Sequence, residues 1–280
     1  GRPTSNPCAP PRTPVPRAMK RPAASSADAA SKAAKGANVP VDGTLELLDG
    51  VRVPCCELTE GTKPEAPLLV FGHGLGEDMQ RDPGLKALKE ALAAMGPGAT
   101  PRVVTYDARG HGASEGWKEL GPGQYHYRCL GTDMLQVAAA HKAPGQGGFI
   151  AGGDSMGAAT AVYSAVLSPT AVKGLVLYQV GTGWEARVPR RANLEKEAEA
   201  KRPEDPAAAD ILLGAALADY PPRDALRGLT LPALIANARD DPVHPAASAE
   251  DVASLLPNAK LVLVDKRSEL PEAFTKAFVE

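Results

Sequence analysis

The sequence predicts an α/β fold in which a mostly parallel sheet is covered by helices on both faces. Two observations carry this prediction. Short apolar runs of strand length alternate with longer segments of helical period, and the alternation repeats from about residue 43 to the end of the sequence. Strands that are joined by helical crossovers lie parallel in one sheet, and the crossovers fall on its two faces.

The first expected elements are a hairpin and a strand, loop and helix. Residues 45–48 and 51–58 are interpreted as antiparallel strands, because the Asp-Gly pair between them suits a turn with positive φ. Residues 68–71 form an unbroken apolar run that ends in a glycine-containing loop. Residues 82–95 then carry leucines at helical spacing and stop at a Gly-Pro pair, which predicts a helix.

The later elements continue the alternation. The expected strands are residues 103–106, 149–152, 174–180, 233–236 and 260–264, and the expected helices are residues 125–141, 156–167, 246–255 and a last helix from residue 271. Residues 181–229 are expected to form a helical cap insertion. Its charged segment predicts one exposed helix, and its apolar segment at residues 211–217 predicts a second.

Composition excludes several classes of protein. Hydrophobic residues make up 44% of the 280 residues, the formal net charge is −2, and no apolar run approaches the ~18 residues of a membrane span. Aromatic residues make up 4%, too few for a platform on which nucleic-acid bases stack. The sequence has neither a nucleotide-binding glycine motif nor metal-ligand spacing. We therefore expect no cofactor, no metal, no nucleic-acid partner and no membrane span.

The first 39 residues differ in character from the rest. They contain seven basic side chains, one acidic side chain and a proline-rich start, which predicts a disordered leader and also suits a transit peptide or a basic nuclear-type arm. They contain no secretory apolar region, and the four cysteines of the sequence lack disulfide or zinc spacing. We expect residues 40–280 to form the folded domain of an intracellular protein, cytoplasmic or, if residues 1–39 are a transit peptide, organellar.

The most informative stretch is Gly-Asp-Ser-Met-Gly at residues 153–157, between an expected strand and an expected helix. A serine on so tight a turn needs glycine two residues before and two after it, because side chains there would collide with the strand and the helix. The turn lifts the Ser155 hydroxyl clear of the sheet. The N–H of Met156 then points to where an oxyanion would develop. This pattern predicts Ser155 as a nucleophile.

Two further loops agree with this interpretation. His-Gly-Leu-Gly at residues 73–76 can supply a second oxyanion donor, the N–H of Leu75, and Asp-Ala-Arg-Gly-His-Gly-Ala-Ser at residues 107–114 follows the next strand. With the three motifs in this order, residues 43–280 resemble the α/β-hydrolase superfamily. The resemblance implies the α/β-hydrolase fold: an eight-stranded, mostly parallel sheet, a small helical cap after strand six, and a triad in the chain order Ser, Asp, His.

The resemblance places the acid after the strand at 233–236, where Asp241 fits best and Asp240 is the alternative. The histidine that family members carry after the last strand is absent, since residues 264–271 contain none. Four histidines have more ordinary explanations in structural loops, at a helix start or at a helix end: His73, His111, His126 and His141. His244 lies on a loop at the ligand-binding edge of the sheet and is the expected base. The alternative is that it only precedes the next helix.

The chain also resembles a set of α/β-hydrolase-like proteins with Thr-x-Trp-Glu-x-Arg after strand six, Asp-Pro-x-His-Pro after strand seven and no final histidine. These motifs stand here at residues 182–187 and 241–245. The resemblance implies a pocket under the cap, for which Trp184, Glu185, Arg187 and His73 are the candidates. The alternative is a cap helix with a buried tryptophan and a local ion pair.

The sequence thus predicts a serine hydrolase for a small-molecule ester or related acyl substrate. Ser155, Asp241 and His244 are the expected catalytic residues, and Leu75 and Met156 are the expected oxyanion hole. Because the usual histidine is missing, a rival interpretation is a catalytically impaired protein of the same fold that binds a ligand or serves as a scaffold subunit. Cofactor-free lyase or proton-transfer chemistry is a third. The sequence predicts no particular oligomeric state.

Overall fold

The computed structural model describes residues 42–59, 62–96, 100–114 and 121–280. The expected leader at residues 1–39 lies outside the described residues. Within the described part of the chain, no helix has both the length and the apolar character needed to cross a bilayer.

Eight strands form one sheet in the described chain, in the order β1-β2-β4-β3-β5-β6-β7-β8. Only β2 runs antiparallel to its neighbours, so the expectation of a mostly parallel eight-stranded sheet is confirmed. The strands are β1 (Asp42–Glu46), β2 (Arg52–Glu57), β3 (Leu68–Gly72), β4 (Arg102–Tyr106), β5 (Phe149–Asp154), β6 (Val172–Tyr178), β7 (Ala233–Ala238) and β8 (Ala259–Val264).

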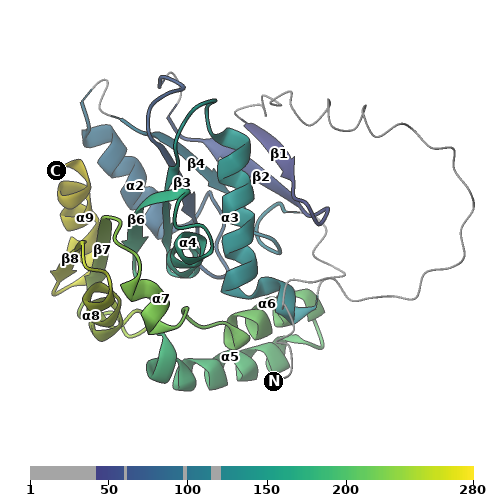
Figure 1. Ribbon diagram of the computed structural model, residues 1–280. Coiled ribbons are helices and arrows are strands. Elements are labelled where there is room, and N and C mark those ends of the chain that lie inside the picture. The colour runs from purple at the N-terminus through teal and green to yellow at the C-terminus, as the bar shows by residue number, and fades with distance from the viewer. Residues whose placement is uncertain (1–41, 60–61, 97–99, 115–120) are drawn as a thin grey trace, which may run out of the picture.

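Helices cover both faces of the sheet, as expected (Figure 1). On one face, α2 (Pro83–Ala94) packs against α9 (Leu270–Val279). On the other, α3 (Tyr127–His141) lies beside α4 (Met156–Leu167), and α8 (Ala246–Leu255) packs on β7 and β8. The parallel strands are apolar on both faces because both are buried.

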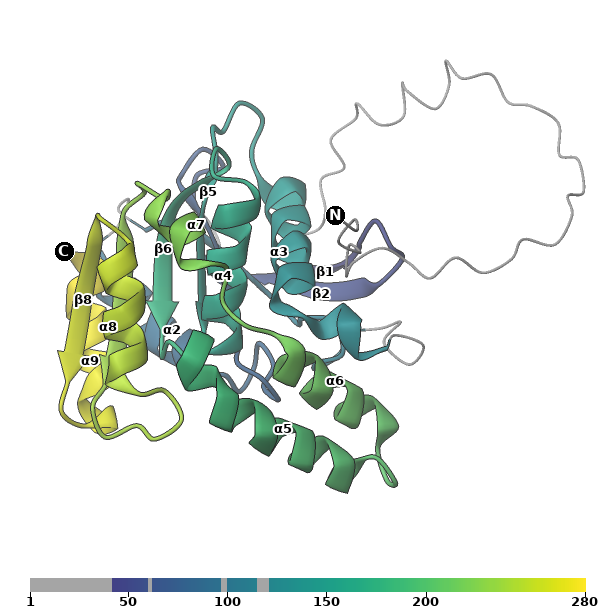
Figure 2. The ribbon, with the colours of Figure 1, turned by 60° about the horizontal axis from the view of Figure 1, so that its bottom comes forward.

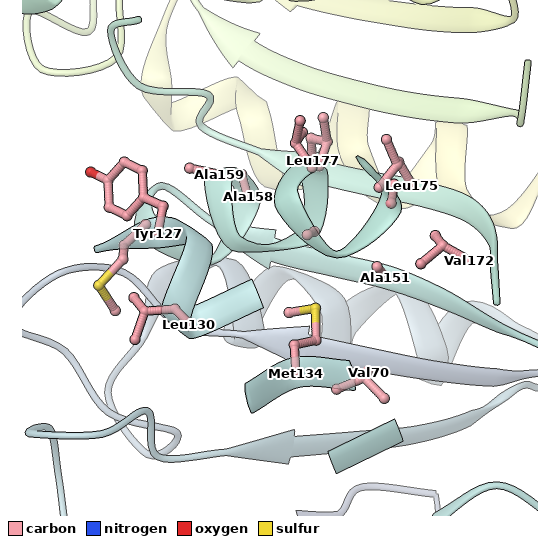
Figure 3. Packing of buried hydrophobic residues seen from close by; sticks show 14 of the residues in the cluster. Val70, Tyr127, Leu130, Met134, Ala151, Ala158, Ala159, Val172, Leu175 and Leu177 are labelled. Atoms are coloured by element: carbon pink, nitrogen blue, oxygen red, sulfur yellow. The ribbon is translucent and has the colours of Figure 1, made fainter. Parts of the chain in front are cut away.

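Successive residues of β3 show how the two faces share the apolar surface. Val70 points into the core that lies under α3 and α4, where it meets Met134 (Figure 3). Its neighbour Phe71 points into the core under α2 and α9, where Phe274 lies. This alternation follows from the two-residue period of a strand. Because β3 to β8 run parallel, their carboxyl ends lie along one edge of the sheet.

Between β6 and β7 lie the 3-10 turn η3 (Trp184–Ala186) and three helices: α5 (Arg187–Lys201), α6 (Pro206–Leu217) and α7 (Arg223–Arg227). Helices α5 and α6 pack against each other as an antiparallel pair beyond the carboxyl ends of the strands (Figure 2). Leu194, Ala215 and Ala216 form their shared apolar core, and Leu75 of the main domain packs against it. The cap is therefore in contact with the loop that follows β3.

Several boundaries differ from the sequence expectation; the first strand, expected at residues 45–48, covers Asp42–Glu46. The strand expected to continue to residue 180 ends at Tyr178, because Gln179 has a φ of 51°. The helix expected from residue 125 begins at Tyr127, because the preceding residues form a 3-10 turn, η2 (Pro122–Tyr125), and the His126 ring accepts the N–H of Arg128 as an N-cap.

Candidate active site

Ser155 occupies the sharp turn between β5 and α4. Its backbone has φ 52° and ψ −103°, a conformation that is costly for a residue with a side chain and is found where function requires it. A Cβ at Gly153 would lie 2.3 Å from the carbonyl carbon of Gly157, and a Cβ at Gly157 would lie 2.0 Å from the carbonyl oxygen of Gly72. The two glycines of the motif are thus required by direct backbone contact.

The structure brings Ser155, His244 and Asp241 together in one hydrogen-bonded chain. Ser155 Oγ lies 2.9 Å from His244 Nε2, and His244 Nδ1 lies 2.9 Å from Asp241 Oδ2. A carboxylate can only accept, so Nδ1 carries the imidazole proton and Nε2 is free to accept the hydroxyl proton of Ser155. The imidazole comes from the loop after β7, three residues beyond the acid.

Asp241 can orient a histidine only three residues further along the chain because its two carboxylate oxygens have different partners. Oδ1 accepts the backbone N–H of Val243 at 2.8 Å and that of His244 at 3.1 Å, which folds the loop back over the carboxylate. Oδ2 is then left to face the His244 ring. A local turn, rather than a contact between distant loops, thus positions the imidazole.

Asn237, at the end of β7, anchors this loop and was not singled out from the sequence. Its side chain is fully buried. Its Oδ1 accepts the N–H of Val180 at 2.8 Å, and its Nδ2 donates to the carbonyls of Val180 and His244, both at 3.1 Å. Asparagine at a strand end is a common turn residue, so only the contacts reveal this role.

Two further residues missed by sequence reasoning contact the acid. Gln179 Nε2 donates to Asp241 Oδ2 at 3.3 Å, and Arg267 Nε lies 3.3 Å from the same oxygen. Arg267 stands in the segment after the last strand, where the resemblance led us to expect a histidine. The alternative acid, Asp240, accepts the backbone N–H of Arg267 at 2.7 Å and has no hydrogen bond to His244 among the described residues.

The electrostatics of the pair favour a neutral imidazole beside an ionised carboxylate. Burial lowers the pKa of His244 below its usual value, and this outweighs the raising effect of Asp241. Burial raises the pKa of Asp241, but the hydrogen bond from His244, its charge and two backbone N–H groups outweigh that effect and hold the pKa below its usual value. At neutral pH the imidazole is therefore unprotonated at Nε2, the form that a general base requires.

The two expected oxyanion donors are the backbone N–H groups of Leu75 and Met156, and of these two residues Leu75 lines the cavity over Ser155. Met156 is the first residue of α4, so its N–H has no acceptor one turn earlier in the helix. The N–H of Leu75 makes no hydrogen bond to the described residues. The loop that carries it is tethered by Asp82 Oδ2, which accepts the N–H of Gly74 at 2.7 Å. The other oxygen of Asp82 caps α2 through the N–H of Leu85.

A buried carboxyl group lies next to the serine. Asp154 Oδ2 accepts the N–H of Gly84 at 3.1 Å, whereas its Oδ1 is buried and has no partner among the described residues. Burial and the neighbouring Asp82 carboxyl raise the pKa of Asp154 well above its usual value. Burial likewise raises the pKa of Asp82 to about 6.

A cavity of about 220 Å³ lies over the serine, and helix α5 of the cap forms part of its wall. It is small, since pockets for drug-sized ligands occupy ~300–1,000 Å³. Its lining comes from the loop after β3, the serine turn, the strand ends of β6 and β7, and α5. The lining includes Leu75, Glu77, Asp154, Ser155, Gln179, Thr182, Arg187, Arg190, Leu194, His244 and Arg267.

Of the four expected pocket residues, Arg187 lines this cavity and the other three do not. His73 is buried with one ring nitrogen against the carbonyl of Gly74 and the other accepting the N–H of Ala108, and burial lowers its pKa to about 4. Trp184 donates from its indole to the carbonyl of Pro221. Glu185 is 79% exposed and pairs with an arginine on α7. Trp184 and Glu185 therefore match the alternative expectation, a packed tryptophan and a local ion pair.

The remaining histidines lie outside the cavity lining. His111 is buried against His73, with its Nδ1 beside the carbonyl of Arg109. His126 caps α3, and His141 lies at the end of the same helix with its Nδ1 beside the carbonyl of Val137. Among the described residues, no three histidine, cysteine or carboxylate side chains group as metal ligands.

Comparison with known proteins bears on the fold. Residues 67–194 match the sequence model of a family described as alpha/beta hydrolase fold. The chain has the α/β-hydrolase fold. None of the curated proteins compared with the chain matches it in sequence.

Several solved α/β-hydrolase-type structures are similar over most of their length. A hydrolase from Pseudomonas aeruginosa PA01 has a TM-score of 0.64 and 23% identity, covering 85% of this chain and 97% of its own. The enol-lactonase from Burkholderia xenovorans LB400 has a TM-score of 0.62 and 22% identity, covering 84% and 98%. A thermophilic esterase from Thermogutta terrifontis has a TM-score of 0.66 and 20% identity, covering 84% and 96%. Identity at this level establishes a shared fold and no shared substrate.

Proposed function

We propose that this α/β-hydrolase-fold protein is a serine hydrolase that cleaves an ester or related acyl substrate through Ser155. The observation that carries the proposal is the continuous hydrogen-bonded chain from Ser155 Oγ through the imidazole of His244 to Asp241 Oδ2. A serine next to a base that is itself oriented by a third group is the arrangement that activates a hydroxyl nucleophile.

The geometry leads to a two-step reaction. Ser155 Oγ attacks the substrate carbonyl while His244 Nε2 takes its proton, and Asp241 stabilises the imidazolium that forms. The N–H groups of Leu75 and Met156 donate to the oxyanion of the tetrahedral intermediate. The intermediate collapses, the leaving alkoxide takes the proton from His244, and an acyl group remains on Ser155. Water repeats the sequence: it gives a proton to His244, attacks the acyl carbonyl, and releases the acid as Ser155 regains its proton.

The rival interpretation of an impaired scaffold protein rested on the absence of a histidine after the last strand. In the structure, His244 supplies an imidazole from the loop after β7 at hydrogen-bonding distance from both partners. Arg267, in the segment where the histidine was expected, instead lies against the acid. This geometry supports the catalytic hypothesis over the scaffold hypothesis.

Labelling with a small fluorophosphonate tests the proposal without knowledge of the substrate. We expect intact-mass analysis to show one adduct on the wild-type protein and none on Ser155→Ala. The matched control is Ser254→Ala, which removes an exposed hydroxyl on α8 and should leave labelling unchanged. A folded wild-type protein that neither reacts with the probe nor hydrolyses p-nitrophenyl acetate would contradict the proposal.

A further inference from the structure

Arg187, the first residue of α5, is a buried cation in the wall of the cavity. The residue is 5% exposed. Within the described chain it makes no ion pair with a carboxylate, although a buried charge is normally paired. Arg187 thus places a buried positive charge without a carboxylate partner in the wall of the cavity that Ser155 also lines, and a negatively charged ligand in that cavity could supply the missing partner.

The protein satisfies part of this guanidinium. Nε donates to the carbonyl of Ala218 at 3.3 Å, and Nη2 donates to the carbonyl of Ala215 and the hydroxyl of Tyr127, both at 2.7 Å. These carbonyls end α6, so they hold the arginine in place and attract its charge. Nη1 has only a 3.5 Å contact, to Thr182 Oγ1, which also lines the cavity. A guanidinium has five N–H donors and these contacts use four of them, so one N–H of Nη1 remains without a partner among the described residues.

Arg190 adds a second positive charge one helical turn further along. Residues 187, 190 and 194 lie on one face of α5 by the three- and four-residue spacing of a helix, and all three line the cavity. The carboxylate partner of Arg190 is Glu197 at 3.3 Å, and the two side chains are 32% and 50% exposed. An ion pair this exposed is weak and leaves the arginine available to a ligand.

The residues that line the cavity include fewer carboxyl groups than arginine side chains. The acidic residues of the lining are Glu77 and Asp154. Burial and the neighbouring Asp82 carboxyl raise the pKa of Asp154 well above its usual value, which disfavours its ionised form. The third arginine of the lining, Arg267, already lies against Asp241. Within the described chain, neither Glu77 nor Asp154 forms an ion pair with Arg187 or Arg190, although all four line the cavity.

We propose that Arg187 and Arg190 bind a carboxylate carried by the substrate, so that the preferred substrates are small acyl esters with a free acid group. This inference rests on the proposed function, since it assigns a substrate class to the same site. One carboxylate oxygen can accept the remaining N–H of Arg187 Nη1, and the guanidinium of Arg190 offers further charge-assisted donors. A short dicarboxylic monoester has a size that suits a cavity of about 220 Å³.

Calorimetry on the Ser155→Ala protein tests this without turnover. The probes are monomethyl glutarate and its uncharged amide analogue, methyl glutaramate, which differ only in the acid group. We expect the carboxylate to bind at least about tenfold more tightly, because hydrogen bonds to charged groups are the stronger ones. Adding Arg190→Met or Arg187→Met should remove most of this preference. The matched control is Arg191→Met, which removes the next arginine of α5, bonded to the carbonyl of Ala216 and absent from the cavity lining.

Equal affinity for the two probes, no binding of the carboxylate up to about 10 mM, or a preference that survives in both Arg190→Met and Arg187→Met would overturn the inference. Arg190 is part-exposed, so its variant remains informative if Arg187→Met does not fold. Hydrolysis of both esters at equal rates, with equal affinities, would leave the hydrolase proposal intact and reject only the carboxylate site. Selective binding without hydrolysis or labelling of the wild-type protein would do the reverse.

Discussion

Replacing His244 by alanine tests the most unusual feature of the site, a base supplied three residues after the acid. The ring makes two hydrogen bonds of 2.9 Å, to Ser155 and to Asp241. A positioned general base typically contributes 10²–10⁴ in rate. At about 1.36 kcal/mol for each tenfold change, we expect the activation barrier to rise by about 2.7–5.4 kcal/mol.

The fold should survive this change. Asp241 keeps the N–H of Val243 at 2.8 Å, and the Gln179 amide and the Arg267 guanidinium, each at 3.3 Å. The carboxylate is therefore not left without partners when the ring is removed. We expect the Tm of His244→Ala to fall by a few degrees, in line with about 1 kcal/mol for a lost hydrogen bond.

The assay is kcat for p-nitrophenyl acetate together with the rate of fluorophosphonate labelling of Ser155. His244→Gln is the matched control: glutamine can still hydrogen-bond but has no basic nitrogen, so it should be as slow as alanine. Imidazole added to His244→Ala should restore part of the activity by entering the space left by the ring. If His244→Ala keeps its activity within about tenfold of wild type, below the usual contribution of a base, the assignment is refuted.

Three further outcomes follow from the same structure. Because the pKa of His244 lies below 6.5, kcat/KM should be level above neutral pH and fall as pH falls through that pKa; a half-point above pH 7 would contradict this. Asn237→Ala should cost about 2–3 kcal/mol and at least tenfold in kcat, measured by denaturant unfolding and kinetics, because the carbonyl of His244 and the backbone of Val180 lose their partner; unchanged kcat would count against an anchoring role. The raised pKa of Asp154 means that its ionisation opposes folding as pH rises, whereas asparagine stays neutral and keeps an acceptor for Gly84. Asp154→Asn should therefore raise the Tm more at pH 8 than at pH 5, and an equal difference at both would reject the argument.

The order of elements could be predicted from the sequence because it depends on local periodicity. Apolar runs bounded by glycine and proline marked the strands, and the Gly-x-Ser-x-Gly spacing placed Ser155 on a strand-to-helix turn. The structure explains why that spacing carries so much information: a Cβ at Gly157 would lie 2.0 Å from the carbonyl oxygen of Gly72. Because a side chain at this position would collide with the backbone, only glycine is compatible with the turn, and the motif can therefore be recognised in the sequence.

The pocket was harder to predict because its residues come from separated segments. Trp184, Glu185 and Arg187 are nearly consecutive, yet only Arg187 lines the cavity. Their directions follow from the way the 3-10 turn leads into α5, where Glu185 meets an arginine of α7 and Trp184 meets the carbonyl of Pro221. A sequence motif shows which residues are close along the chain, and the direction of each side chain depends on the packing of the cap.

The sequence by itself determined the fold class, the strand order along the chain, the turn that carries Ser155 and the candidates Asp241 and His244, because these depend on local pattern and on backbone contacts that few residues can satisfy. Only the tertiary structure decided that His244 reaches both Ser155 and Asp241, that Asn237 anchors its loop, and that Arg187 and Arg190 face the cavity. The reason is physical: hydrogen bonds and charge pairs act over about 3 Å, and which side chains come that close is set by the packing of strands and helices far apart in the chain.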